Sequence, residues 1–128
     1  MSDMKFLIDS AHAKGMGVIM DWVANHTAWY HLWTKIPGFY TVNSSGSIVH
    51  PPSTMWTDHA DLNVDNRIMR DSTIASMKWW IKEYDIDGFR CDYADGLPSD
   101  FWRDAISKHT SNCRLYFHIL IGKMLCRM

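Results

Sequence analysis

Residues 86–93 read Ile-Asp-Gly-Phe-Arg-Cys-Asp-Tyr, a short run in which two charged side chains stand near the end of an apolar strand. Because side chains alternate between the faces of a strand, Arg90 and Asp92 point one way and Phe89 and Cys91 the other. A neighbouring guanidinium favours the ionised form of a carboxyl group at neutral pH. On spacing alone, the pair fits either a structural ion pair at a strand end or a positioned carboxylate in a catalytic site.

A second apolar run lies earlier in the chain. Residues 17–23 read Gly-Val-Ile-Met-Asp-Trp-Val, with Asp21 as the one charged side chain. A run of this kind is typical of a strand in a parallel sheet, buried on both faces. In parallel α/β folds the chemistry lies at the carboxyl ends of the strands. Asp21 is therefore a candidate site residue beside Arg90 and Asp92.

Helical periodicity flanks both strands. Residues 3–14 and 67–84 carry apolar side chains at helical spacing, and a third helix is expected from Pro98, which suits a first helical turn, to about residue 109. Residues 115–121 are a candidate further strand. Strands that alternate with helices predict right-handed βαβ units and a parallel sheet. The expected buried helix faces comprise Met4, Leu7, Ile8 and Ala11 in the first helix, Ile74, Met77, Ile81 and Tyr84 in the second, and Phe101, Trp102, Ala105 and Ile106 in the third.

Residues 27–65 lack sustained periodicity and contain three of the four prolines and the Asn43-Ser44-Ser45-Gly46 turn cluster. Compact domains seldom carry so long a loop without a function. We therefore expect a small, aromatic-rich subdomain inserted at residues 27–65. It separates a first α/β part at residues 1–26 from a second at residues 66–112, and an atypical tail follows at residues 113–128.

Composition limits the classes of partner. The 128 residues are enough for one ordinary domain, with 47% hydrophobic residues and a formal net charge of -1. No basic face suggests nucleic acid as a partner, and no apolar run suggests a membrane span or a signal peptide. The three cysteines, Cys91, Cys113 and Cys126, are too widely spaced for a disulfide framework or a metal-binding pair.

Seven tryptophans are a high count for a chain of this length. Aromatic rings pack in hydrophobic cores, and they also contact the apolar faces of pyranose rings in sugar-binding proteins. Core packing is favoured for Trp79 and Trp80, which lie within a helical pattern. For Trp29, Trp33 and Trp56, in loop-like sequence, both interpretations stay open, and Trp56 is the candidate for substrate binding.

Three segments resemble the α-amylase family of glycoside hydrolases. Residues 21–27 (Asp-Trp-Val-Ala-Asn-His-Thr) resemble the segment that ends its third barrel strand, and residues 88–92 (Gly-Phe-Arg-Cys-Asp) resemble the end of the fourth. Between them, residues 60–66 (Ala-Asp-Leu-Asn-Val-Asp-Asn) resemble a marker near the end of the family's inserted domain. The resemblance covers residues 2–112 and, through residues 87–102, is greatest to bacterial members that act on starch-like α-glucans. It implies a partial (β/α)8 TIM barrel, about strands three to five, with an inserted subdomain.

The resemblance also implies a role for matched residues. Asp92 would be the nucleophile of a retaining glycosidase that cleaves α-glucosidic bonds of starch or maltooligosaccharides. Arg90 would keep Asp92 ionised and oriented, and His26 would hydrogen-bond the reacting sugar. Asp21 would support the site from the neighbouring strand.

Calcium is the cofactor that the resemblance suggests. In many family members the residue at the position of Asn25 helps to hold a structural calcium ion. Many of those members also carry a Lys-His pair three and four positions after the nucleophile, where this chain has Asp95 and Gly96. The expectation therefore rests on Asn25 and on carboxylates of the insertion, whose oxygen atoms suit a hard cation.

A retaining glycosidase needs a second carboxyl group, which protonates the leaving group. In the family this acid is a glutamate at the end of the next barrel strand, whereas the single glutamate here, Glu83, precedes the nucleophile strand within a helix. Residues 113–128 contain no Asp or Glu and depart from the family's pattern, which suggests a frameshift, a sequencing error or a truncated gene. We expect the isolated chain to be inactive.

Three alternatives to hydrolysis are open. The same strand ends occur in family members that isomerise sugars or transfer glucosyl groups. The chain could also be a non-catalytic module that binds glucan through Trp29, Trp33 and Trp56. Finally, it could be a gene fragment with no function of its own.

Overall fold

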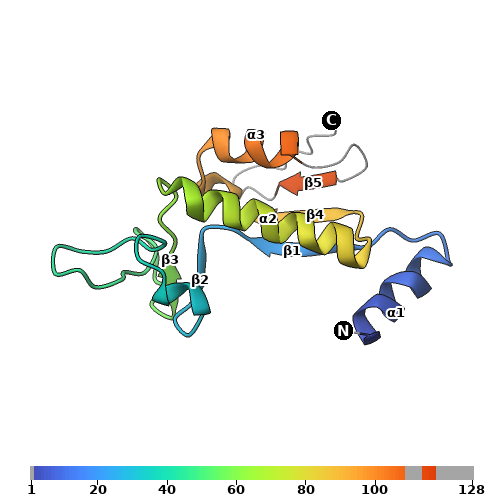
Figure 1. The fold of residues 1–128 in the computed structure, drawn as a ribbon, viewed down its shortest axis with the longest axis horizontal. Coiled ribbons are helices and arrows are strands. Elements are labelled where there is room, and N and C mark those ends of the chain that lie inside the picture. The colour runs from blue at the N-terminus through green and yellow to red at the C-terminus, as the bar shows by residue number, and fades with distance from the viewer. Residues whose placement is uncertain (1, 109–113, 118–128) are drawn as a thin grey trace.

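The computed structural model describes residues 2–108 and 114–117, and its centre is a parallel sheet (Figure 1). Three strands form the sheet in the order β1-β4-β5: β1 at Ile19–Val23, β4 at Gly88–Asp92 and β5 at Arg114–Phe117. Both pairings are parallel, which confirms the predicted arrangement. Within the described residues the sheet is open and forms no closed barrel. The part of the predicted last strand beyond Phe117 lies outside the described residues.

Three α-helices alternate with these strands: α1 at Ser2–His12, α2 at Arg67–Tyr84 and α3 at Ser99–Lys108. Their positions confirm the predicted order of helices and strands. The start of α2 is capped by Asn66, whose side chain accepts a hydrogen bond from the backbone N–H of Met69. None of the described helices is long and apolar enough to cross a membrane.

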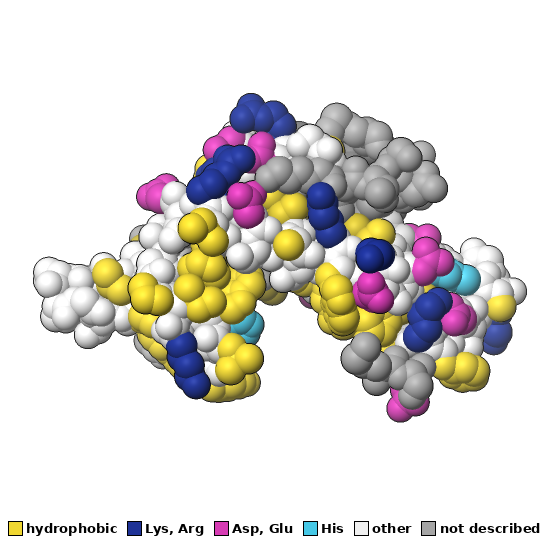
Figure 2. All heavy atoms as spheres, in the orientation of Figure 1, with side chains coloured by type: hydrophobic (Ala, Val, Ile, Leu, Met, Phe, Trp, Pro, Cys, Tyr) yellow, Lys and Arg dark blue, Asp and Glu magenta, His cyan; other side chains and the backbone are white. Residues whose placement is uncertain are grey.

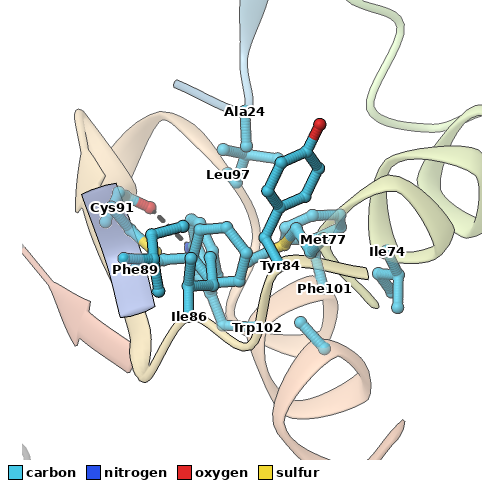
Figure 3. Packing of buried hydrophobic residues seen from close by; sticks show 13 residues of the cluster. Ala24, Ile74, Met77, Tyr84, Ile86, Phe89, Cys91, Leu97, Phe101 and Trp102 are labelled. Atoms are coloured by element: carbon cyan, nitrogen blue, oxygen red, sulfur yellow. Dashed lines mark hydrogen bonds between the residues drawn. The ribbon is translucent and has the colours of Figure 1, made fainter. Parts of the chain in front are cut away.

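The main hydrophobic core lies between the sheet and the helices α2 and α3 (Figure 3). From β4, the side chains of Phe89 and Cys91 are fully buried in it. The indole N–H of Trp102 donates a hydrogen bond of 2.8 Å to the backbone carbonyl of Ala94, drawn as the dashed line in Figure 3. Since side chains alternate along a strand, the two charged residues of β4 lie on the opposite face. Other members of this core include Ile74, Met77, Tyr84, Ile86 and Phe101.

The structure corrects the expectation that the strand at residues 17–23 is buried on both faces. Met20 and Trp22 pack against the core, whereas Ile19 and Val23 on the other face are 48% and 40% exposed. The reason is that the core packs against only one face of β1, the face that carries Met20 and Trp22. Its second face, which also carries Asp21, is therefore open.

The predicted buried face of the first helix is also largely wrong. Ile8 is fully buried, but Leu7 is 62% exposed and Met4 is 39% exposed. Figure 1 shows α1 at the end of the molecule opposite to β2 and β3, and Figure 2 shows hydrophobic side chains on the surface in that region. Helical spacing identifies the helix, but it does not tell how much of the apolar face finds a partner.

Asp87, which precedes β4, connects the starts of two neighbouring strands of the sheet. Its backbone N–H donates to the carbonyl of Val18 at 2.8 Å, and its carboxylate accepts from the N–H of Val18 at 2.6 Å. Nε2 of His12, at the end of α1, lies 3.0 Å from the same carboxylate oxygen. Asp87 therefore ties the start of β1 to the start of β4 and helps to set their register.

The segment between β1 and α2 forms a small unit of its own, with antiparallel strands β2 at His26–Ala28 and β3 at His59–Asp61. A 3-10 helix, η1, spans Leu32–Lys35. Figure 1 shows this unit beyond the carboxyl end of β1. It occupies most of the residues for which an insertion is predicted. Its core contains Phe39, Tyr40, Ala60 and Leu62, and Met69 of α2 joins them.

Two ion pairs join α2 to α3. The guanidinium of Arg70 donates two hydrogen bonds to the Asp100 carboxylate, at 2.9 and 3.1 Å, and Nη2 of Arg67 lies 3.1 Å from Asp104. Arg70 also donates to the backbone carbonyl of Val64 at 2.6 Å, which links the end of the insertion to the helices. The hydrogen bonds from Arg70 are the main reason why the pKa of Asp100 lies below its usual 3.8.

We predict that Asp100→Asn destabilises the chain, because it removes a carboxylate whose ionised form the native state favours. Since the pKa of Asp100 is lowered in the folded state, its contribution is present above pH 3.8 and is lost as pH falls through the folded value. Thermal unfolding midpoints of the two proteins should therefore differ at about pH 7 and converge in strong acid. The matched control, Asp9→Asn, breaks an exposed pair with Lys5 and should change the midpoint less. A difference for Asp100→Asn that persists in strong acid would contradict the prediction.

Candidate active site

Asp21, Arg90 and Asp92 form a continuous hydrogen-bonded chain on the open face of the sheet. In the parallel register of β1 with β4, Asp21 lies beside Arg90 and Val23 beside Asp92. Nη1 of Arg90 donates to both carboxylate oxygens of Asp21, at 2.6 and 2.7 Å, and Nη2 donates to Oδ1 of Asp92 at 2.6 Å. The prediction that Arg90 and Asp92 share a face is confirmed, and strand pairing adds Asp21 to them.

The guanidinium between two carboxylates dominates the electrostatics of this chain. The pKa of Arg90 is raised, chiefly by its hydrogen bonds to Asp21 and further by the charge of Asp92. A planar guanidinium fixes the direction of each carboxylate as well as balancing its charge. The side chains of Arg90 and Asp92 are 37% and 41% exposed, so a substrate can reach them. Asp92 is thus both oriented and accessible.

His26, Trp56 and His59 form an aromatic cluster next to these residues. The first residues of β2 and β3 bring the rings of His26 and His59 to a centroid distance of 4.3 Å, and Trp56 lies 5.4 Å from His26. Burial, and then the charge of His59, lower the pKa of His26, although Asp58 and Asp92 oppose the shift. His26 is therefore neutral at neutral pH, and it lies close enough to Asp92 to respond to its charge.

Tyr93 and His59 belong to this cluster, and no motif in the sequence marks them as site residues. The ring of Tyr93 lies 5.1 Å from that of Trp56, with an angle of 75° between the planes. The signal that could identify Tyr93 is its position directly after Asp92. His59 carries no comparable signal, because only the pairing of β2 with β3 brings it to His26.

The other tryptophans have different surroundings. Trp29 is 40% exposed, and its indole N–H donates to a backbone carbonyl of the insertion at 2.9 Å. Trp33 packs against the core of the insertion. Trp80 packs against the main core as predicted, but Trp79 is 43% exposed, because adjacent helical positions face different directions. Of the tryptophans left open by the sequence, Trp56 is the one in ring contact with His26.

Asn25 lies between β1 and β2, is 3% exposed, and has a side-chain oxygen without a hydrogen-bond partner. A buried amide oxygen of this kind is a suitable ligand for a hard cation. Calcium, however, takes about six to eight oxygen ligands. In the part of the chain that the structure describes, no group of three or more His, Cys, Asp or Glu side chains is placed to hold a metal ion.

Glu83 lies near the start of β4, at the opposite end of that strand from Asp92, and so is not placed to act together with it. It belongs to the last turn of α2, which leads into the start of β4, whereas Asp92 ends that strand. Its side chain is 45% exposed and lies 3.8 Å from Lys82. The single glutamate of the sequence is thus excluded as the second carboxyl group of the site.

Known proteins include relatives of this chain, although no family model matches it. The chain is 32% identical over 107 residues to the 1,4-alpha-glucan branching enzyme GlgB of Jannaschia sp. (strain CCS1), a match that covers 80% of the chain and 15% of that enzyme. It is 31% identical over 120 residues to Alpha-amylase 3 of Dictyoglomus thermophilum, a match that covers 78% of the chain and 24% of that protein.

A solved structure agrees with these relatives. The maltogenic alpha-amylase AmyB from Thermotoga neapolitana matches 91% of the chain with a TM-score of 0.79 and 33% identity, and the match covers 27% of that protein. The chain thus spans less than a third of the length of each of these proteins. Similarity in sequence and in structure shows that the chain belongs to the α-amylase family of glycoside hydrolases.

Proposed function

We propose that the chain carries the nucleophile half of a retaining site that cleaves α-glucans, with Asp92 as the nucleophile. The proposal rests on the hydrogen bonds of Arg90, which connect Asp92 to Asp21 across two parallel strands. The three residues lie toward the carboxyl ends of these strands, where α/β folds place their chemistry. The relatives' names, a 1,4-alpha-glucan branching enzyme and an alpha-amylase, support an α-linked glucan as the substrate. We further infer that β1, β4 and β5 correspond to about strands three to five of a (β/α)8 barrel.

The proposed reaction is a double displacement. A carboxylate oxygen of Asp92 attacks the anomeric carbon of a glucosyl unit, while the bond from that carbon to the leaving oxygen breaks. The leaving oxygen takes a proton from a second carboxyl group, about 5 Å from the first, for which Glu83 is misplaced. Water, activated by that second group, then breaks the glycosyl ester of Asp92 with net retention of configuration.

The neighbours of Asp92 have distinct roles in this proposal. Arg90 balances the charge of the Asp92 carboxylate and holds its Oδ1 by a hydrogen bond, and Asp21 fixes the direction of Arg90 from the adjacent strand. His26, which is neutral because burial lowers its pKa, is suited to hydrogen-bond a sugar hydroxyl. Trp56, in ring contact with His26, supplies an aromatic surface for the pyranose ring.

Glucosyl transfer is the second candidate function, and the similarity to a branching enzyme favours it. Both reactions share the glycosyl ester of Asp92, and they differ in whether water or a glucan hydroxyl breaks that ester. Product analysis separates them, because hydrolysis creates new reducing ends whereas transfer leaves their number unchanged.

We predict that the isolated chain releases no sugar from maltooligosaccharides, whereas a chimera that completes the catalytic domain releases it. In the chimera, residues 19–108 replace the matching segment of the Thermotoga neapolitana maltogenic alpha-amylase, which provides the rest of a catalytic domain. Asp92→Asn should lower kcat by at least about a thousandfold, because an amide cannot replace the carboxylate as nucleophile. Release of reducing sugar from maltooligosaccharides is the measurement.

Asp95→Asn is the matched control, because it makes the same chemical change at an exposed position three residues further on. Its activity should stay close to that of the unsubstituted chimera. Equal losses in the two variants, or full activity in Asp92→Asn, would contradict the role of Asp92. Sugar release by the isolated chain that Asp92→Asn abolishes would overturn the expectation that the chain is inactive alone.

Calcium binding through Asn25 stays a prediction, and no step of the proposed reaction depends on it. Calorimetric titration of the chain with calcium chloride should show saturable binding, and Asn25→Ala should weaken it, because the substitution removes the buried amide oxygen. Asn43→Ala, at an exposed turn, is the control and should bind as the wild type does. Equal heats for the wild type and Asn25→Ala would exclude Asn25 as a ligand.

A further inference from the structure

Tyr93, the residue directly after Asp92, has a left-handed backbone with φ 49° and ψ 44°. Apart from glycines, only Ser53 and Asp85 share a positive φ with it among the described residues. For a bulky aromatic residue this conformation is unfavourable, and it persists only where the surrounding structure holds it. Because the strain lies one residue after the proposed nucleophile, the contacts that hold the Tyr93 ring bear on the site.

On one side, the ring of Tyr93 rests on Gly96. A Cβ at residue 96 would lie 2.3 Å from Cε1 and 2.4 Å from Cδ1 of Tyr93, well inside the distance that atoms tolerate. Gly96 is not among the glycines with positive φ, so its backbone conformation does not require glycine. Glycine is needed at residue 96 for space, because any side chain there would displace the Tyr93 ring.

Beyond Gly96, the ring of Tyr93 contacts Trp56 edge-to-face at 5.1 Å, and Trp56 in turn contacts His26 at 5.4 Å. The backbone hydrogen bonds of Trp56 stay within the insertion, where its N–H donates to Oγ1 of Thr54 and its carbonyl accepts from the N–H of His59. Tyr93, which directly follows β4, therefore contacts Trp56 from outside the insertion. An aromatic pair of this geometry prefers a defined orientation of both rings.

We infer that Tyr93, whose ring packs on Gly96, is a positioning residue that fixes the Trp56 ring against His26, and thereby shapes the site for one glucosyl unit. This inference rests on the proposed function, in which Trp56 contacts the sugar. The backbone of Tyr93 is left-handed, its ring contacts Trp56 of the insertion, and the missing side chain at Gly96 leaves room for that ring. No hydrogen bond of the phenol is needed for this role, so phenylalanine should replace Tyr93 without loss.

The position of Trp56 is measured by fluorine NMR on the 128-residue chain with fluorinated tryptophan, in which Trp56→Phe identifies the resonance of Trp56. Tyr93→Ala and Gly96→Ala should both shift that resonance, and Tyr93→Phe should leave it in place. In the Tyr93→Ala background, Gly96→Ala should add no further shift, because the ring that it displaces is already absent. An unchanged resonance in Tyr93→Ala, or additive shifts in the double variant, would overturn the inference.

The effect on the site is measured by titration with maltotetraose. Tyr93→Ala should bind about threefold to tenfold more weakly, as expected for the loss of an aromatic contact, and Tyr93→Phe should bind as the wild type does. Tyr30→Ala removes a 91% exposed tyrosine and is the control, with unchanged affinity expected. A shifted Trp56 resonance with unchanged affinity in Tyr93→Ala would overturn the role in binding.

Failure of the proposed function gives a different result. A folded wild-type chain that binds no maltotetraose would count against Trp56 as a sugar contact, and the fluorine resonances would still decide whether Tyr93 positions Trp56. Far-ultraviolet circular dichroism checks that each variant is folded. Because Tyr93→Phe keeps the ring, its recovery of both the resonance and the affinity separates a positioning role from a general loss of structure.

Discussion

The parallel pairing of β1 with β4 is the constraint on which the rest of the structure depends. It places Asp21 beside Arg90, so that one guanidinium contacts carboxylates from two strands. Hydrogen bonds between Asp87 and Val18 hold the start of this pairing. A shift by one residue would turn Asp21 toward the core face and remove its contact with Arg90. The charged chain on the open face is therefore a direct consequence of strand register.

The insertion brings aromatic side chains to the same end of the sheet. β2 starts at His26, soon after β1 ends, and its pairing with β3 places His59 against His26. Trp56 joins this pair from the preceding loop, and the ring of Tyr93 connects the cluster to the end of β4. The charged residues of the sheet and the aromatic rings of the insertion therefore lie next to each other. Small-molecule sites typically combine an apolar wall with a few directed polar groups in this way.

Local patterns are enough to predict much of this fold. The helix expected at residues 67–84 is α2, because the spacing of apolar side chains along a helix is a local signal. Alternation along β4 likewise predicts the shared face of Arg90 and Asp92. The exposure of β1 and α1 cannot be predicted in this way, since it depends on which neighbours cover them. The contacts of Tyr93 and His59 depend on a left-handed backbone and on a strand pairing, which no spacing rule marks.

Trapping of the glycosyl–enzyme shows directly whether Asp92 attacks the sugar. A fluorinated α-glucosyl fluoride forms such an intermediate and slows its breakdown, so mass spectrometry of peptides from the chimera locates the attached sugar. The sugar should be found on the peptide that contains Asp92, and Asp92→Asn should not be labelled. Labelling at Asp21, or at a carboxylate outside residues 19–108, would contradict this prediction.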